Sequence, residues 1–161
     1  MQNHVQGDQH MDVMKNVDEI LDFAIEREEE SSQFYTNLAA KVQDVPMSKV
    51  FRDFAREERG HKAKLLAIKK GKLLLPAAKK VADLKIADYV VDVVPTPEMS
   101  YQQALILAMK KEKASFLLYT NLAETAGDDN LRATLLGLAQ EEAKHKLRFE
   151  IEYDEHVLSE N

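Results

Sequence analysis

The sequence predicts an all-α protein, a four-helix bundle built from two duplicated antiparallel helical hairpins that a long crossover joins. Three observations support this fold class. Apolar residues recur at intervals of three and four through four long segments, which is the spacing of bundle helices. Glycine and proline are scarce, with five and four residues among 161, so signals for strands and tight turns are few. The third observation is a repeat, since the pentapeptide YTNLA occurs at 35–39 and again at 119–123.

The first two helices are expected to form one hairpin. The first is predicted from Asn16, a suitable N-cap with Glu19 three residues later, to about Val42. The second begins near Pro46, a favourable first-turn residue, and ends at Gly71. Because the link between the two helices is short, we expect them to be antiparallel neighbours.

The last two helices form a second hairpin of the same kind. The third helix has an S-x-x-Q cap at Ser100 and Gln103 and ends at Gly127, and the fourth follows GDDN and continues to about Asp154. The segment between the hairpins, about 72–99, is long enough to cross the length of the bundle. Such a crossover would make the third helix parallel to the second, and PAAKKVADL within it is compatible with one short helix.

The length suits one domain with a polar tail. We expect residues 1–15 to be a disordered N-terminal tail and residues 16–156 to form the bundle. Within the bundle, the two repeat halves would span about 16–71 and 100–155.

Composition and charge exclude several classes of function and partner. The formal net charge of −6 argues against nucleic acid or an anionic membrane surface as the main partner. Because the chain contains no cysteine, disulfides, thiolate metal ligands and thiol nucleophiles are excluded. No stretch approaches the roughly 18 apolar residues of a membrane span, and the first residues lack the apolar segment of a secretory signal. We therefore expect a cytoplasmic protein.

One constant offset of 84 residues aligns the two halves of the sequence without a gap. Shared amphipathicity would match residue classes, whereas this register matches identities on two separate helices. We interpret the repeat as duplication of a helical hairpin, with the halves related by an approximate two-fold axis. The pairs that matter most are Glu28/Glu112, Ser31/Ser115, Tyr35/Tyr119, Glu58/Glu142 and His61/His145.

Each apolar stripe carries one glutamate where leucine or isoleucine would be expected. Burying an isolated carboxylate is costly, and four of them in one core would also repel each other. Two of the glutamates begin an E-x-x-H sequence, which places an imidazole one turn away on the same face. One Glu from each of two helices and an E-x-x-H from each of the other two is the pattern of a carboxylate-bridged two-metal site. The predicted metal ligands are Glu28, Glu58, His61, Glu112, Glu142 and His145.

Charge and donor type indicate which metals would fit. Four carboxylates balance two divalent cations, and mixed oxygen and nitrogen ligation suits iron or manganese, with zinc also possible. No catalytic residue is predicted beyond the metal site. A bundle without metal would have to sustain four buried glutamates, which is physically unfavourable.

The repeat also indicates which of the polar residues near the predicted ligands belong to the site. In EREEE, only Glu28 has a glutamate partner and lies on the stripe. Glu57 and Glu141 also repeat, one position off the stripe, and could either support the ligands or form surface pairs. Tyr35 and Tyr119 each follow a proposed ligand by seven residues; they are either core tyrosines or hydrogen-bond donors that orient a ligand carboxylate.

Four segments resemble the ferritin-like di-iron carboxylate proteins, and most closely the rubrerythrin group: AIEREEESSQFYTNLA, FAREERGHKAKL, AMKKEKASFLLYTNLAE and LAQEEAKHKLRFE. The resemblance covers about 17–155. It implies a ferritin-like bundle that holds two iron ions, with two glutamates bridging the metals and the other ligands each binding one metal. The implied bridging ligands are Glu58 and Glu142, and the implied single-metal ligands are Glu28, Glu112, His61 and His145.

The resemblance also implies redox chemistry with peroxide or dioxygen, either peroxide reduction or ferrous iron oxidation, in a homodimer. The chain lacks the four-cysteine rubredoxin-like module of full-length rubrerythrins, so electrons would come from a separate donor such as a rubredoxin-like protein. It has Ser115, matched by Ser31, where the family's peroxidase members carry an extra carboxylate, so the site is similar to the symmetric bacterioferritin-type set. The alternative is a non-catalytic protein that binds or handles iron or another metal.

Overall fold

Four long α-helices form the bundle in this computed structural model, which describes residues 3–73 and 84–160. No strand occurs within those ranges, so the predicted all-α four-helix fold is confirmed. A short 3-10 helix, η2, lies in the crossover. The elements are α1 (Asn3–Lys41), α2 (Val45–Gly71), η2 (Ile86–Tyr89), α4 (Tyr101–Thr125) and α5 (Asp129–Glu160).

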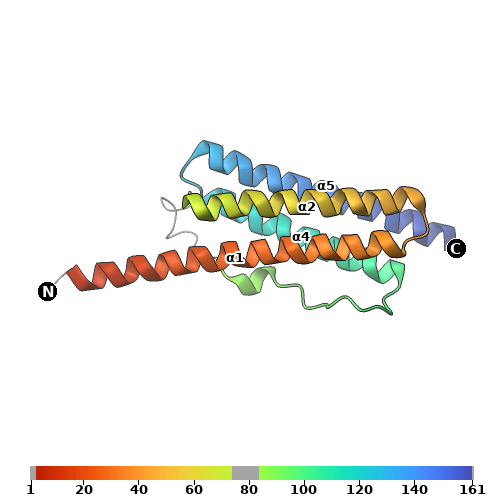
Figure 1. Ribbon diagram of the computed structural model, residues 1–161, viewed down its shortest axis with the longest axis horizontal. Coiled ribbons are helices and arrows are strands. Elements are labelled where there is room, and N and C mark those ends of the chain that lie inside the picture. The colour runs from red at the N-terminus through yellow and green to blue at the C-terminus, as the bar shows by residue number, and fades with distance from the viewer. Residues whose placement is uncertain (1–2, 74–83, 161) are drawn as a thin grey trace.

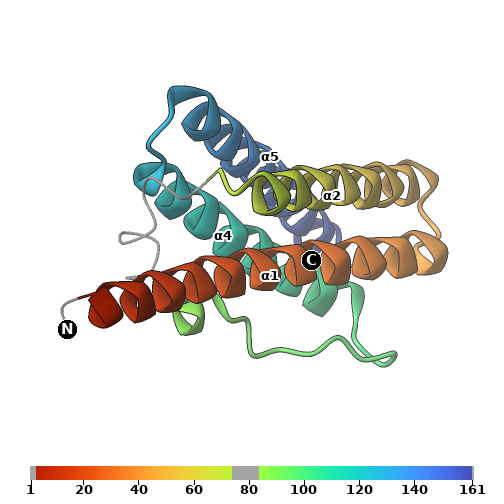
Figure 2. The same ribbon diagram turned by 60° about the vertical axis from the view of Figure 1, so that its left-hand side comes forward.

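The helices pack as two antiparallel hairpins. The α1 helix packs against α2, and α4 packs against α5, in agreement with the short links between them (Figure 1). The described part of the crossover runs along the outside of the bundle and enters α4 at the far end, so that α4 runs parallel to α2 (Figures 1 and 2). The short helix considered for PAAKKVADL falls almost entirely outside the described residues, and η2 follows it.

Side-chain caps fix the start of two helices. The Asp44 carboxylate accepts from the Met47 backbone N–H at 3.1 Å, and Pro46 occupies the first turn of α2. At the start of α4, Ser100 and Gln103 form the predicted capping box, in which each side chain accepts from the backbone N–H of the other. The predicted start of α2 near Pro46 and the predicted capping box at Ser100 therefore agree with the structure.

The α2 helix ends at Gly71, as predicted. The left-handed conformation belongs to Lys72, with φ of 53°, and not to Gly71. The backbone N–H groups of Lys72 and Leu73 donate to the Lys69 and Ile68 carbonyls, which satisfies two acceptors that the helix end leaves free. Hydrogen bonding of the last turn therefore offsets the cost of left-handed backbone at a non-glycine residue.

Two helices are longer than the sequence predicted. The α1 helix begins at Asn3 and not at Asn16, and α5 continues to Glu160, beyond the expected end near Asp154. Both extensions are free of proline, the strongest helix breaker, so their polar composition does not end the helix. The first turns of α1 project past the other helices (Figure 1).

A polar layer divides the core into two apolar clusters. The first, mostly aliphatic, includes Leu21, Leu65, Leu122 and Leu135 and is called here the aliphatic cluster. The second includes Phe34, Tyr35, Phe51 and Phe149 and is called the aromatic cluster. On α1 the aliphatic cluster ends at Ala24 and the aromatic cluster begins at Phe34, so the buried polar residues of that helix lie between them. None of the described helices is long and apolar enough to cross a membrane.

Candidate metal centre

The six predicted ligands lie together in the polar layer. The 3–4 periodicity of each helix turns one glutamate inward, and the E-x-x-H spacing on α2 and α5 adds a histidine one turn further along the same face. None of the six side chains is more than 3% exposed. They are Glu28 from α1, Glu58 and His61 from α2, Glu112 from α4, and Glu142 and His145 from α5.

The donor atoms form two overlapping groups. In each group, one ligand atom from every residue lies within 4.8 Å of the others. Glu58 and Glu142 belong to both groups, whereas the other four residues belong to one each. This arrangement suits two cations that share two carboxylates. The groups are Glu28, Glu58, His61 and Glu142, and Glu58, Glu112, Glu142 and His145.

The donor set fits divalent metal ions. Buried oxygen atoms of all four glutamates, together with Nδ1 of both histidines, have no hydrogen-bond partner among the described residues. His61 Nδ1 lies 2.6 Å from a Glu142 oxygen, and His145 Nδ1 lies 3.0 Å from a Glu58 oxygen. Buried groups of this kind are normally paired, so lone pairs that converge without hydrogen bonds indicate a cation as their common partner.

The pKa shifts of the carboxylates show the cost of the site without metal. Burial raises the pKa of Glu58 and of Glu142 well above the usual range, and the neighbouring carboxylates raise both further. Burial acts in the same direction on Glu112, but the neighbouring His145, Glu142 and Tyr35 side chains outweigh it and lower its pKa. In the metal-free protein, protons on Glu58 and Glu142 would therefore take the place of positive charge.

The neighbouring carboxylates also make the two histidines easier to protonate. Burial alone would lower the pKa of His61 and His145, but their carboxylate neighbours outweigh it and raise both pKa values. Since a metal ligand must be deprotonated, metal binding would release these protons. The two imidazole rings are stacked 6.2 Å apart, with 15° between their planes.

Two tyrosines donate to ligand carboxylates, each across to the other hairpin. The Tyr35 hydroxyl donates to Glu112 at 2.5 Å, and the Tyr119 hydroxyl donates to Glu28. Burial raises the pKa of both hydroxyls well above the usual value, so they remain protonated donors. Of the two interpretations left open by the sequence, the structure therefore favours orientation of the ligands over packing alone.

A family model described as Rubrerythrin matches residues 19–153. The chain belongs to the rubrerythrin family. The matched segment contains all six candidate ligands and both tyrosines, and the resemblance stated from the four sequence segments is thereby confirmed, as is the ferritin-like class of the bundle. Comparisons with curated proteins and with solved structures gave no significant match.

In this rubrerythrin-family chain, two outer glutamates support the histidines. The Glu57 carboxylate accepts from His145 Nε2 at 2.6 Å, and Glu141 contacts His61 Nε2 in the same way. The sequence left these glutamates open between supporting and surface roles. Both are partly exposed, at 51% and 43% of the side chain, yet both orient a buried imidazole so that Nδ1 faces the cluster.

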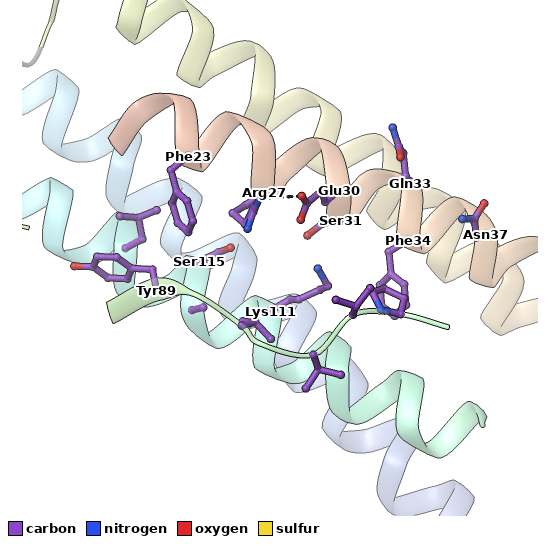
Figure 3. A pocket seen from close by; sticks show the side chains of 16 residues that line it. Phe23, Arg27, Glu30, Ser31, Gln33, Phe34, Asn37, Tyr89, Lys111 and Ser115 are labelled. Atoms are coloured by element: carbon purple, nitrogen blue, oxygen red, sulfur yellow. Dashed lines mark hydrogen bonds and ion pairs between the residues drawn. The ribbon is translucent and has the colours of Figure 1, made fainter. Parts of the chain in front are cut away.

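The repeat-related serines Ser31 and Ser115 lie beside the candidate metal centre. Ser31 and Ser115 lie one turn after Glu28 and Glu112, where α1 and α4 approach each other (Figure 3). Ser31 is only 5% exposed, and both serines line a cavity on the outer side of this seam. The serine positions therefore mark a border between the candidate metal centre and that cavity.

Proposed function

We propose that this chain is a non-haem di-iron protein that carries out redox chemistry with peroxide or dioxygen at a carboxylate-bridged two-metal site. The reaction would be peroxide reduction or ferrous iron oxidation. The observation that carries the proposal is the pair of buried donor groups that share Glu58 and Glu142. Iron bound there would supply the electron-transfer chemistry, for which the same oxygen and nitrogen donors also allow manganese. Zinc would fit the donors without redox activity.

The protein's own groups have defined roles in this proposal. Glu58 and Glu142 would bridge two ions, while Glu28 and Glu112 would each bind one. The tyrosine and outer glutamate contacts hold the single-metal ligands in one orientation before metal arrives, which lowers the entropic cost of binding. The aliphatic and aromatic clusters on either side exclude water from both ends of the site, which strengthens the interactions within it.

Electrons would come from a separate donor. The 161 residues contain no cysteine, so no thiolate-ligated redox centre can be formed by them. A rubredoxin-like protein is the donor that we propose. Assembly as a homodimer and a cytoplasmic location complete the proposal.

Anaerobic titration with ferrous iron tests this function. We expect two iron ions per chain, and, after addition of peroxide or air, near-ultraviolet absorption of carboxylate-bound ferric iron that develops faster than with free iron. Glu58→Gln should reduce the iron content, whereas Glu29→Gln, at a partly exposed residue that pairs with Lys62 of α2, should not. Fewer than two ions in the unsubstituted protein, or oxidation no faster than that of free iron, would contradict the proposal.

The second candidate is a protein that binds or handles metal without turnover. The absence of cysteine from the sequence and the serines at 31 and 115 favour this alternative. Multiple turnovers of peroxide with a reduced rubredoxin-type protein as electron donor would exclude it. A single stoichiometric oxidation of the bound iron, with no further consumption of peroxide, would support it.

A further inference from the structure

A cavity of about 390 Å³ lies between α1, α4 and residues 89–95 of the crossover (Figure 3). Its volume falls in the range of small-molecule sites. Valine and proline side chains of the crossover form one wall, and Phe23 and Phe34 lie on the α1 side. The walls are therefore largely apolar, and they are separate from the ligands of the candidate metal centre.

Two cationic side chains enter this cavity from opposite helices (Figure 3). The Arg27 guanidinium lies 4.9 Å from the centroid of the Phe23 ring, and the Lys111 ammonium lies 5.8 Å from that of Phe34. Each cation thus contacts an aromatic face, which holds its charge at the wall and leaves the space between the helices open.

These cations are incompletely paired within the described part of the chain. Arg27 Nη2 donates to Glu30 Oε1 at 2.8 Å, but Arg27 Nε is buried and has no hydrogen-bond partner. Lys111 makes no hydrogen bond or ion pair there. Glu30 is the one carboxylate among the residues that line the cavity. Arg27 Nη2 also lies 3.5 Å from Glu26 Oε1, but the Glu26 side chain is exposed and does not line the cavity. Among the lining residues, two cations face one carboxylate, which leaves unused donors beside an apolar wall.

We propose that this cavity binds a small organic carboxylate that has an apolar body. The carboxylate would accept hydrogen bonds from Arg27 and Lys111, which form strong, charge-assisted interactions with anions. The body would contact the valines of the crossover and Leu118, in place of water. A plain inorganic anion would leave the apolar walls uncovered, and a neutral molecule would leave both cations unpaired.

This assignment does not rest on the redox function. It uses residues that neighbour the candidate ligands in sequence but face the opposite side of the α1–α4 seam: Arg27 precedes Glu28, and Lys111 precedes Glu112. Failure of one proposal would therefore leave the other standing. The test must nevertheless separate binding in the cavity from direct binding of a carboxylate to metal.

Isothermal titration calorimetry on the full chain as purified, with its metal content measured, tests the assignment. The probes are benzoate, its neutral analogue benzyl alcohol, and inorganic phosphate. We expect one benzoate per chain, bound at least tenfold more tightly than either comparison compound and more weakly as salt is added. No benzoate binding, or equal affinity for benzyl alcohol or phosphate, would overturn the proposal.

Substitutions locate the binding site. Lys111→Met should weaken benzoate binding at least tenfold, whereas Lys113→Met makes the same charge change at an exposed position outside the cavity and should leave it unchanged. Ala114→Leu should also weaken binding, because it fills the cavity without changing charge. Circular dichroism checks that each variant is folded. Equal affinity in the Lys111 and Lys113 variants would place the benzoate elsewhere, for example on the metal, and would overturn the assignment.

Discussion

The Tyr35 hydroxyl donates to the Glu112 carboxylate, 77 residues later in the sequence and on the opposite hairpin. Tyr119 and Glu28 make the corresponding contact. The outer glutamates cross over in the same way, since Glu57 contacts a histidine of α5 and Glu141 a histidine of α2. Each set of candidate ligands is therefore contacted by the other hairpin, and each of the two donor groups contains residues from both hairpins.

Removing one of these hydroxyls should weaken metal binding. Tyr35→Phe leaves the Glu112 carboxylate without its donor while keeping the ring in the aromatic cluster. Loss of such a supporting contact typically lowers metal affinity about 10–100-fold. Competition with a chromophoric chelator, using cobalt or ferrous iron, measures the affinity at each position, and we expect the loss to concentrate at one of the two.

Tyr101→Phe is the matched control for this experiment. It also removes a hydroxyl that donates to a glutamate, Glu152 at 2.9 Å, but away from the candidate metal centre. Metal affinity should stay within about twofold of that of the unsubstituted protein, since residues that are far apart and share no partner affect each other little. An equal loss in both variants would indicate general destabilisation and would refute the orienting role of Tyr35.

The outer glutamates should act on the histidine of the opposite hairpin. Glu141→Gln removes the charge that faces His61 Nε2, so the metal position that includes His61 should weaken while the position that includes His145 is retained. The expected decrease is again about 10–100-fold. Two-site cobalt titration followed by visible absorption distinguishes the positions. The Glu57→Gln variant should reverse the pattern, and weakening of the same position by both substitutions would contradict it.

Most of the fold and of the candidate site could be predicted from the periodicity of apolar residues and the spacing of the metal-donor residues. The repeat and the apolar stripe selected Glu28 from its acidic neighbours, because a residue on a regular helix faces the core or solvent according to its position alone. The crossed contacts could not be predicted in this way. The 84-residue offset relates equivalent positions, such as Tyr35 and Tyr119, but says nothing about which side chains meet in space.

Helix ends were predicted less well than helix faces. The capping box at Ser100 has a local sequence signature and agreed with the structure, whereas the polar residues before Asn16 carry no comparable signal. Apolar periodicity marks the part of a helix that packs against the core. Where a helix projects beyond its neighbours, the apolar pattern therefore ends before the helix does. The duplication of the hairpins stays an interpretation, supported by contacts that follow the offset.

Metal removal should reverse the pH dependence of stability near neutrality. The pKa values of Glu58, Glu142, His61 and His145 are raised in the folded protein. A raised pKa gives stability that is present below the unfolded pKa and is lost as pH rises through the folded pKa. The melting temperature of the metal-free protein should therefore fall between about pH 5 and 8, a window that begins just above the unfolded value of glutamate.

Bound metal should oppose this loss. Deprotonated carboxylates and imidazoles bind metal more tightly, and ligands that bind only the folded state stabilise it. Differential scanning calorimetry with and without two equivalents of zinc, a cation without redox activity, measures both trends. If the metal-free protein became more stable with rising pH across this window, the inferred protonation of the buried groups would be wrong.

Neutralising one bridging glutamate should separate stability from metal binding. Glu142 is fully buried, and without metal its charge is opposed by burial and by three other glutamates. Glu142→Gln keeps the shape of the side chain and removes the charge. Since the raised pKa of Glu142 costs the folded state stability at about pH 8, the metal-free variant should be more stable than the unsubstituted protein, by on the order of 1 kcal/mol or more. Both metal positions should weaken together, because Glu142 belongs to both donor groups.

Urea unfolding measures the stability and metal titration measures the affinity of each metal position. Glu124→Gln, at an exposed position on α4, should alter neither quantity. A destabilised metal-free Glu142→Gln protein would show that burial does not oppose this charge, and loss of a single metal position would show that this carboxylate does not bridge.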